Sequence, residues 1–248
     1  MELIMNRSEN ALWLCTLIIS ILSLSINSNL IDLVIYWSII ILCIGNAKRL
    51  HSNKYIHAST IIRRSMYILP LLLPLIIEVK FPETNTSLIW ISVGLVVGIL
   101  FILPKITTWR IVLSDDYVSL VTKKENRFYY FMGTYTLIGC AIAEELFFRY
   151  YIMNMFEGTE HILLGIFLSS FLFMVLHYGT KWSSKFTKFD LSLQLIFGLV
   201  SASMYVFSGS IVPSLIAHIT YNSPHIIQNI KSILFTYKNN ESKTELGA

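Results

Sequence analysis

Long apolar runs alternate with short polar stretches along this chain. An α-helix needs ~20 predominantly apolar residues to cross a bilayer, and several of the runs approach that length. We read about eight of them as membrane helices. Some are shorter than a full crossing, and the first two are candidates for partly re-entrant segments. The predicted helices cover residues 11–26, 30–45, 66–79, 87–103, 128–153, 161–177, 191–207 and 211–235.

The composition supports a membrane protein. Hydrophobic residues make up 54% of the 248, charged residues only 14%, and the mean hydropathy is +0.63. Soluble globular domains carry about 25% charged residues. The expected fold is therefore an all-α, polytopic membrane bundle of about eight transmembrane helices. We therefore expect the lipid bilayer to surround this protein as one of its partners.

The basic residues gather in three loops between the apolar runs, which indicates membrane orientation and argues against a nucleic-acid partner. By the positive-inside rule these loops lie in the cytoplasm. An even number of helices then places both termini there, in a multi-pass protein of the cell membrane. The loop residues are Lys48, Arg49, Lys54, Arg63 and Arg64; Lys105, Arg110, Lys123, Lys124 and Arg127; and Lys181, Lys185 and Lys188.

Two carboxylates and one guanidinium lie inside the fifth apolar run, at Glu144, Glu145 and Arg149. Each charge at the centre of a membrane helix costs about 2.5–3.5 kcal/mol on insertion scales, so three together indicate a functional site. Glu145 and Arg149 are four residues apart and share a helix face, where they can pair. Glu144 points about 100° away and is left to face another group.

Further polar side chains follow in later apolar runs, namely His177, His218 and Asn222. His218 and Asn222 are four residues apart on one helix face. Phe173 precedes His177 by one turn and can wall its imidazole. With a rise of ~1.5 Å per residue, Glu144, His177 and His218 lie about 14, 24 and 11 Å from the non-cytoplasmic ends of their helices. We expect them to line one cavity in the middle or inner half of the membrane.

These three groups resemble the motifs of the CPBP family of intramembrane proteases, which includes CAAX proteases and bacteriocin-processing proteins. The motif residues are Glu144-Glu145-x-x-x-Arg149, Phe173-x-x-x-His177 and His218-x-x-x-Asn222. Their order and spacing match, and the resemblance covers about residues 128–235. Residues 1–127 form N-terminal membrane spans and cytoplasmic loops. Residues 236–248 form a polar tail, and we expect residues 238–248 to be disordered.

The resemblance implies a helical bundle around an intramembrane catalytic cavity, and a role for each motif residue. Glu144 matches the carboxylate that activates the attacking water, with help from His177. His218 and Asn222 match the pair that stabilises the oxyanion. Glu145, Arg149 and Phe173 match supporting positions. The implied activity is hydrolysis of a membrane-associated peptide or protein, in peptide maturation, pheromone signalling or bacteriocin immunity.

The residues themselves favour water as the nucleophile. Peptide hydrolysis needs a nucleophile, a proton acceptor and donors aimed at the developing oxyanion. No serine stands in a nucleophile-elbow motif. The three cysteines form no CxxC pair, and only Cys140, one turn before Glu144, is a conceivable thiol nucleophile. A carboxylate that activates water without a cofactor is therefore the preferred mechanism.

Two alternatives stay open. Glu144, His177 and His218 could bind zinc, with water as the fourth ligand, although no HExxH sequence is present. The polar residues could instead line a transport path, because intramembrane Glu and His are common in proton-coupled transporters, or form a non-catalytic binding or immunity protein. An oxyanion hole needs His218 and Asn222 on one face, whereas a proton relay does not.

Overall fold

The computed structural model describes residues 7–26, 28, 30–47, 49–50, 52, 54–78, 82–122, 127–180 and 187–245, and these residues form helices and no strands. The predicted all-α class is confirmed. The helices are α1 (Arg7–Ser25), α2 (Leu30–Ala47), α3 (Ile56–Ser65), α4 (Leu69–Glu78), α5 (Leu88–Ile102), η1 (Leu103–Lys105), α6 (Ile106–Val112), α7 (Asp115–Val121), α8 (Arg127–Glu145), η2 (Leu146–Tyr151), α9 (Ile152–Asn154), α10 (Ile162–Thr180), α11 (Lys188–Ser208) and α12 (Val212–Glu245).

Several helices are long and apolar enough to cross a membrane, so the chain is a multi-pass membrane protein. Four described segments meet that test, and the bent pair α3 and α4 makes up to five. Two shorter apolar helices lie within α1 and α10. The predicted total of eight crossings stays a prediction. The four segments are Leu30–Ala47, Leu88–Val112, Arg127–Asn154 and Lys188–Ser208.

Two expectations from the sequence were wrong. The first basic loop contains a helix, α3, which meets α4 at a bend of 54°. The polar tail is not irregular up to residue 245, because α12 continues through Glu245. No glycine or proline follows Phe235 before that point to end the helix. The loop residues Lys48, Lys123, Lys124, Lys181 and Lys185 lie outside the described residues.

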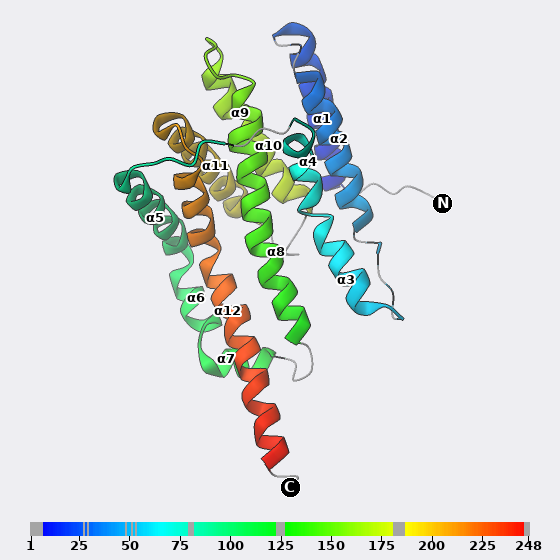
Figure 1. Cartoon of the computed structure of the whole chain (residues 1–248), viewed down its shortest axis with the longest axis vertical. Coiled ribbons are helices and arrows are strands. Elements are labelled where there is room, and N and C mark those ends of the chain that lie inside the picture. The colour runs from blue at the N-terminus through cyan, green and yellow to red at the C-terminus, as the bar shows by residue number, and fades with distance from the viewer. Residues whose placement is uncertain are drawn as a thin grey trace.

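Helix α8 runs through the middle of the bundle with α12 beside it (Figure 1). Helix α12 packs most extensively against α5 and α8, whereas α10 packs against α11, and α1 against α2 and α10. Helix α4 contacts α2 and the segment that follows α8. Helices α5 and α11 therefore lie on one side of α8 and α12, and α1 to α4 lie on the other (Figure 1).

Close packing of α5 on α12 depends on two glycines. A Cβ atom at Gly94 would lie 2.4 Å from the backbone oxygen of Pro213, and one at Gly98 would lie 2.7 Å from that of Ala217 and 2.5 Å from Cβ of Thr220. Hydrogen is the largest substituent that fits. This contact fixes the face of α12 that turns towards α8, and with it the direction of His218.

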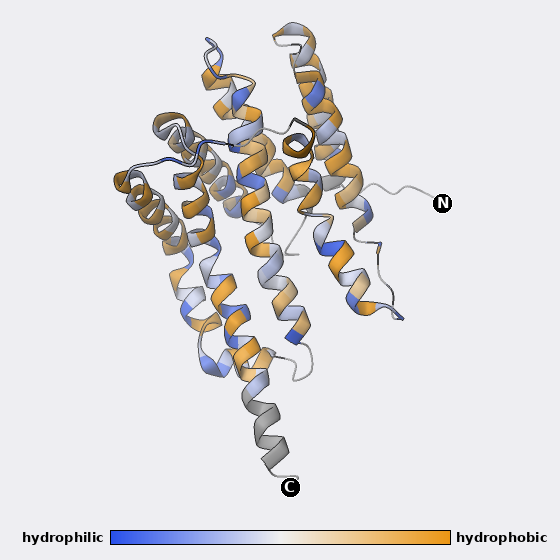
Figure 2. Cartoon of the chain, in the orientation of Figure 1, coloured by the Kyte–Doolittle hydropathy of each residue, from blue (hydrophilic) through white to orange (hydrophobic). Residues whose placement is uncertain are grey.

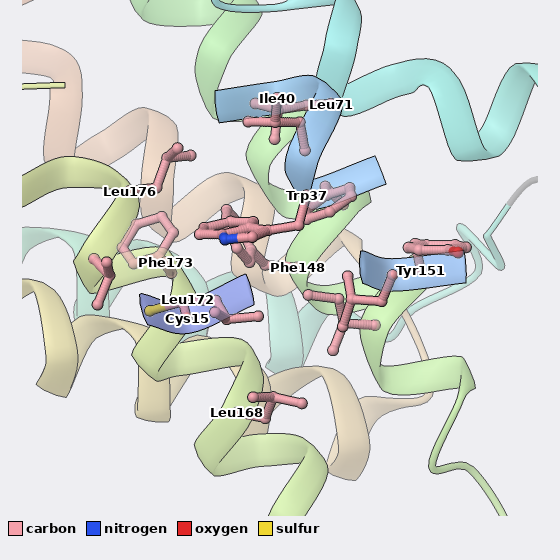
Figure 3. Packing of buried hydrophobic residues seen from close by; sticks show 14 of the residues in the cluster. Cys15, Trp37, Ile40, Leu71, Phe148, Tyr151, Leu168, Leu172, Phe173 and Leu176 are labelled. Atoms are coloured by element: carbon pink, nitrogen blue, oxygen red, sulfur yellow. The ribbon is translucent and has the colours of Figure 1, made fainter. Parts of the chain in front are cut away.

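A buried aromatic core joins the two halves of the chain (Figure 3). Trp37 of α2 lies near Phe148, with ring centroids 6.5 Å apart, and its indole N–H donates to the backbone oxygen of Leu12, 3.2 Å away. Phe148 in turn contacts Phe173 of α10 at 5.5 Å. Apolar residues also cover the outer helices, as the colouring of α5 shows in Figure 2, which suits contact with lipid.

We expect Gly98→Ala to reduce the free energy of unfolding by about 1–3 kcal/mol, because overpacking forces neighbouring atoms apart. Gly45→Ala is the matched control, since nothing lies within 4 Å of a Cβ atom there. It should be neutral or stabilising by under ~1 kcal/mol. Thermal unfolding in the same detergent measures both. Equal stability of the two variants would contradict the packing described here.

Candidate active site

The two adjacent carboxylates at the end of α8 have different partners. Glu145 Oε2 lies 3.3 Å from Arg149 Nε, and both side chains are fully buried. Glu144 makes no such pair and turns towards α10 and α12, where it approaches His177 and His218. The i,i+4 pairing and the separate direction of Glu144 are the geometry that the sequence predicts.

Arg149 lies in a π-helical segment, η2, which follows α8 directly. Such segments are rare and are often found at functional sites. Ser169 of α10 donates its hydroxyl to the backbone oxygen of Phe148 at 2.6 Å and accepts a hydrogen bond from Arg149 Nη1 at 3.3 Å. The guanidinium also lies 4.7 Å from the ring centroid of Phe173, close enough for a cation–π interaction. One buried serine thus ties η2 to α10.

His218 is oriented by Glu145. Its Nδ1 lies 2.8 Å from Glu145 Oε1. An ionised carboxylate can only accept, so Nδ1 carries the proton and donates. The other ring nitrogen, Nε2, then faces Glu144, with 3.7 Å between it and Oε2. Glu145 therefore pairs with the Arg149 guanidinium through one oxygen and accepts a hydrogen bond from His218 through the other.

His177 is oriented by its own helix. Its Nδ1 lies 3.0 Å from the backbone oxygen of Phe173, one turn earlier. Because a carbonyl oxygen only accepts, Nδ1 donates here too. The ring lies beside that of Phe173, with centroids 4.4 Å apart. The Nε2 atom is left to face Glu144 Oε2, again at 3.7 Å.

Three potential acceptors therefore meet around one point. With neutral imidazoles, the Nε2 atoms of His177 and His218 both present lone pairs to the Glu144 carboxylate. Both separations exceed the normal range of an N–H···O hydrogen bond. Such a cluster of acceptors favours a ligand that donates more than one hydrogen bond, as a water molecule does. The arrangement suits activation of water by Glu144.

Asn222 lies one turn beyond His218 on α12. Its position along the bundle follows from the contacts between α8 and α12. Glu144 lies against His218, and Gly133 lies against Asn229. Eleven residues separate the two contacts on each helix. The helices are thus antiparallel with matched rise. The Asn222 side chain is half-buried and has no hydrogen-bond partner among the described residues. Its amide is available to a ligand.

Aromatic rings enclose the histidines. Phe173 and Phe197 lie 5.7 and 5.3 Å from the ring centroid of His218, and Tyr221 stacks on Phe197 at 5.3 Å. Sequence reasoning found Phe173 but missed Phe197, Tyr221 and Ser169. These residues belong to no charged cluster, so the sequence carries no local signal for them. Apolar walls strengthen every electrostatic interaction at Glu144 by excluding water.

The alternative chemistries receive different support from the geometry. Within the part of the chain that the structure describes, no group of three or more His, Cys, Asp or Glu side chains is arranged to hold a metal ion. Zinc bound by Glu144, His177 and His218 stays an untested alternative. Cys140 is a buried free thiol, and no described contact links it to a histidine.

Comparison with known families finds one match. Residues 126–224, two fifths of the chain, match the family described as "Type II CAAX prenyl endopeptidase Rce1-like". Comparisons with curated proteins and with solved structures found no match. The matched region contains every residue of the site and agrees with the resemblance to CPBP proteases. This part of the chain is thus similar to a family of CAAX-type endopeptidases, and that similarity supports an intramembrane endopeptidase.

The structure brings Glu144, His177 and His218 together from three helices, with Asn222 one turn away. It places Glu145, Arg149 and Phe173 directly behind them. The membrane depths estimated for Glu144, His177 and His218 from the sequence differ by more than their 3.7 Å contacts allow. The estimate counted residues from the predicted helix ends, and these ends do not lie at one level in the bundle. The catalytic roles of these residues stay predictions. So do the domain boundaries at residues 127 and 235.

We expect Arg149→Met to lower the free energy of unfolding by about 3–5 kcal/mol, because it leaves the buried charge of Glu145 uncompensated. The double variant Glu145→Gln/Arg149→Met removes both charges and should recover most of that loss. Thermal unfolding of the wild type, both single variants and the double variant gives the coupling between the two residues. A double variant as unstable as Arg149→Met would contradict a buried ion pair.

Proposed function

We propose that this protein is a glutamate-type intramembrane endopeptidase in which Glu144 activates the attacking water. One observation supports this most strongly. Among the described residues Glu144 faces two imidazole nitrogens and forms no ion pair with Lys or Arg, whereas the neighbouring Glu145 is held by Arg149 and His218. One carboxylate of the pair is thus structural, and the other is left available as a base.

The proposed reaction is a direct hydrolysis. Water held by Glu144 and His177 attacks the carbonyl carbon of the scissile peptide, and Glu144 takes the proton. The carbonyl oxygen becomes an oxyanion, which accepts one hydrogen bond from the Asn222 amide and a second from His218 Nε2. For the second bond the His218 imidazole takes up a proton from solvent before the attack and returns it after product release. The C–N bond then breaks, and the leaving amine takes the proton that Glu144 holds.

The substrate is a membrane-associated peptide or protein. The matched family is named for prenylated CAAX substrates, and related bacterial proteins suggest peptide maturation, pheromone signalling or bacteriocin immunity. Which of these applies depends on groups outside the catalytic cluster. The structure supports the chemistry at Glu144, and the substrate is identified by the experiment below.

We also propose that the end of the bundle with α7 and the end of α12 faces the cytoplasm (Figure 1). Arg110, Arg127 and Lys231 lie in or beside these segments, and basic residues concentrate on the cytoplasmic side. Both termini then lie in the cytoplasm. Accessibility of single cysteines, introduced in α7 and in the turn between α11 and α12, to an impermeant thiol reagent tests this orientation.

We expect Glu144→Gln to abolish proteolysis while the protein stays folded, because a neutral amide cannot accept the proton. Cells that carry the wild type or Glu144→Gln at equal protein level are compared by mass spectrometry of membrane peptides and protein termini. A substrate should accumulate uncut in the variant alone. Glu157→Gln, at an exposed carboxylate beyond α9, is the matched control.

Two outcomes would contradict this mechanism. If Glu144→Gln cut at the wild-type rate, Glu144 would not be the base. If the biological effect persisted in an inactive Glu144→Gln variant, the protein would act as a non-catalytic binding or immunity protein. The zinc alternative has its own readout: loss of activity with a strong chelator, restored by zinc, together with one bound zinc per chain by elemental analysis.

We expect Asn222→Ala to lower kcat by about 100-fold to 1,000-fold with little change in KM, because removal of one oxyanion-hole donor has effects of that size. Asn229→Ala is the matched control, since Asn229 lies on the same helix against Gly133 and away from Glu144. Steady-state kinetics on the substrate identified above measures both. Equal kcat values for the two variants would contradict an oxyanion role for Asn222.

A further inference from the structure

The buried side-chain amide of Gln194 lies about one helical turn along the bundle from His218 and has no assigned role. Gln194 of α11 is 8% exposed, and its Nε2 donates to the hydroxyl of Tyr221 at 3.4 Å. Its Oε1 is closed off from solvent and has no hydrogen-bond partner among the described residues. Turning the amide by 180° exchanges its two ends, and one end lacks a partner in either orientation.

The position of this amide relates it to the site. Tyr221 follows His218 by three residues on α12, and Gln194 precedes Phe197 by three residues on α11. Phe197 contacts both rings, with centroids 5.3 Å from that of His218 and 5.3 Å from that of Tyr221. Gln194 and Tyr221 therefore form the next layer after the His218 layer, about one helical turn or ~5 Å along the bundle. Asn222 projects from α12 at the same level.

The chemistry of the amide indicates its ligand. A glutamine side chain offers one acceptor and two N–H donors, which complement the N–H and C=O of a backbone peptide group. An extended peptide advances ~3.3 Å per residue. A substrate with its scissile carbonyl at Glu144 thus brings a peptide group one or two residues away to the level of Gln194.

We propose that Gln194 and Tyr221 form a subsite that binds a backbone peptide group of the substrate, one or two residues from the bond that is cut. This inference rests on the proposed protease function. In the free protein the Tyr221 hydroxyl accepts from the Nε2 end of the amide, and the Tyr221 ring is also edge-on to Phe101 at 6.1 Å. In the complex, Oε1, which has no hydrogen-bond partner in the free protein, accepts from a peptide N–H of the substrate.

A purely structural role explains the observation less well. An unsatisfied buried acceptor destabilises the fold, and leucine would fill a similar volume without that penalty. A glutamine that only packs α11 against α12 should therefore not be left half-satisfied. A glutamine that binds substrate is expected to have an unsatisfied acceptor in the free protein and a satisfied one in the complex. Substitution of Gln194 by leucine should then stabilise the fold and weaken substrate binding.

The test uses the full chain in nanodiscs and a library of N-palmitoylated decapeptides of random sequence. The best-cleaved peptide is resynthesised with a methyl group on each backbone nitrogen in turn. In the wild type, methylation at one position within two residues of the cut should raise KM about tenfold, since it removes one hydrogen bond donor. Proline should be excluded at the same position.

Gln194→Leu should raise KM about tenfold with kcat retained, and methylation at that position should then add nothing. Its Tm should rise by roughly 2–4 °C, because the unsatisfied acceptor is gone. Tyr221→Phe removes only the hydroxyl and should raise KM by less. Gln228→Leu, at a half-buried position ten residues after His218 on α12, is the matched control and should leave KM unchanged.

Two results would overturn the subsite. In one, Gln194→Leu lowers Tm and leaves KM unchanged, which makes Gln194 a packing residue. In the other, the effects of Gln194→Leu and backbone methylation are additive at every position, so the two groups do not meet. Failure of the protease function itself looks different: the wild type would then leave every peptide of the library uncut, as Glu144→Gln does.

Discussion

The buried ion pair between Glu145 and Arg149 is the interaction on which the site depends. Neither charge could stay in an apolar bundle alone, because an unpaired buried charge is strongly destabilising. The pair also holds His218 through the second carboxylate oxygen of Glu145 and is tied to α10 through Ser169. A single pair thus sets the directions of α8, α10 and α12 around one point.

Pairing makes two neighbouring carboxylates unequal. Glu145 forms an ion pair with Arg149 and accepts a hydrogen bond from His218, whereas Glu144 is left to accept from a water molecule. Sites with two titratable groups commonly divide their roles in this way, through different surroundings. Here the division follows from helix geometry, since residue 149 is one turn from 145 and points away from 144. The same geometry gives His218 a fixed tautomer.

Much of this could be predicted from the sequence. Charged residues inside apolar runs are expensive, so Glu144, Glu145 and Arg149 stand out, and their spacing gives the pair directly. The histidines stand out for the same reason. The π-helical turn and the positions of Ser169 and Phe197 could not be predicted, because they depend on how α10 and α11 pack. The bend before α4 and the length of α12 were missed too, since polar segments were assumed to be loops.

The most direct test of the account is the fate of oxygen in the first turnover. The protein is mixed with less than one equivalent of substrate in ¹⁸O-labelled water, and both the new carboxyl terminus and Glu144 are examined by mass spectrometry. Activation of water by Glu144 predicts one ¹⁸O atom in the product and none in Glu144. Label in the Glu144 carboxylate would show a covalent acyl intermediate and would contradict the account.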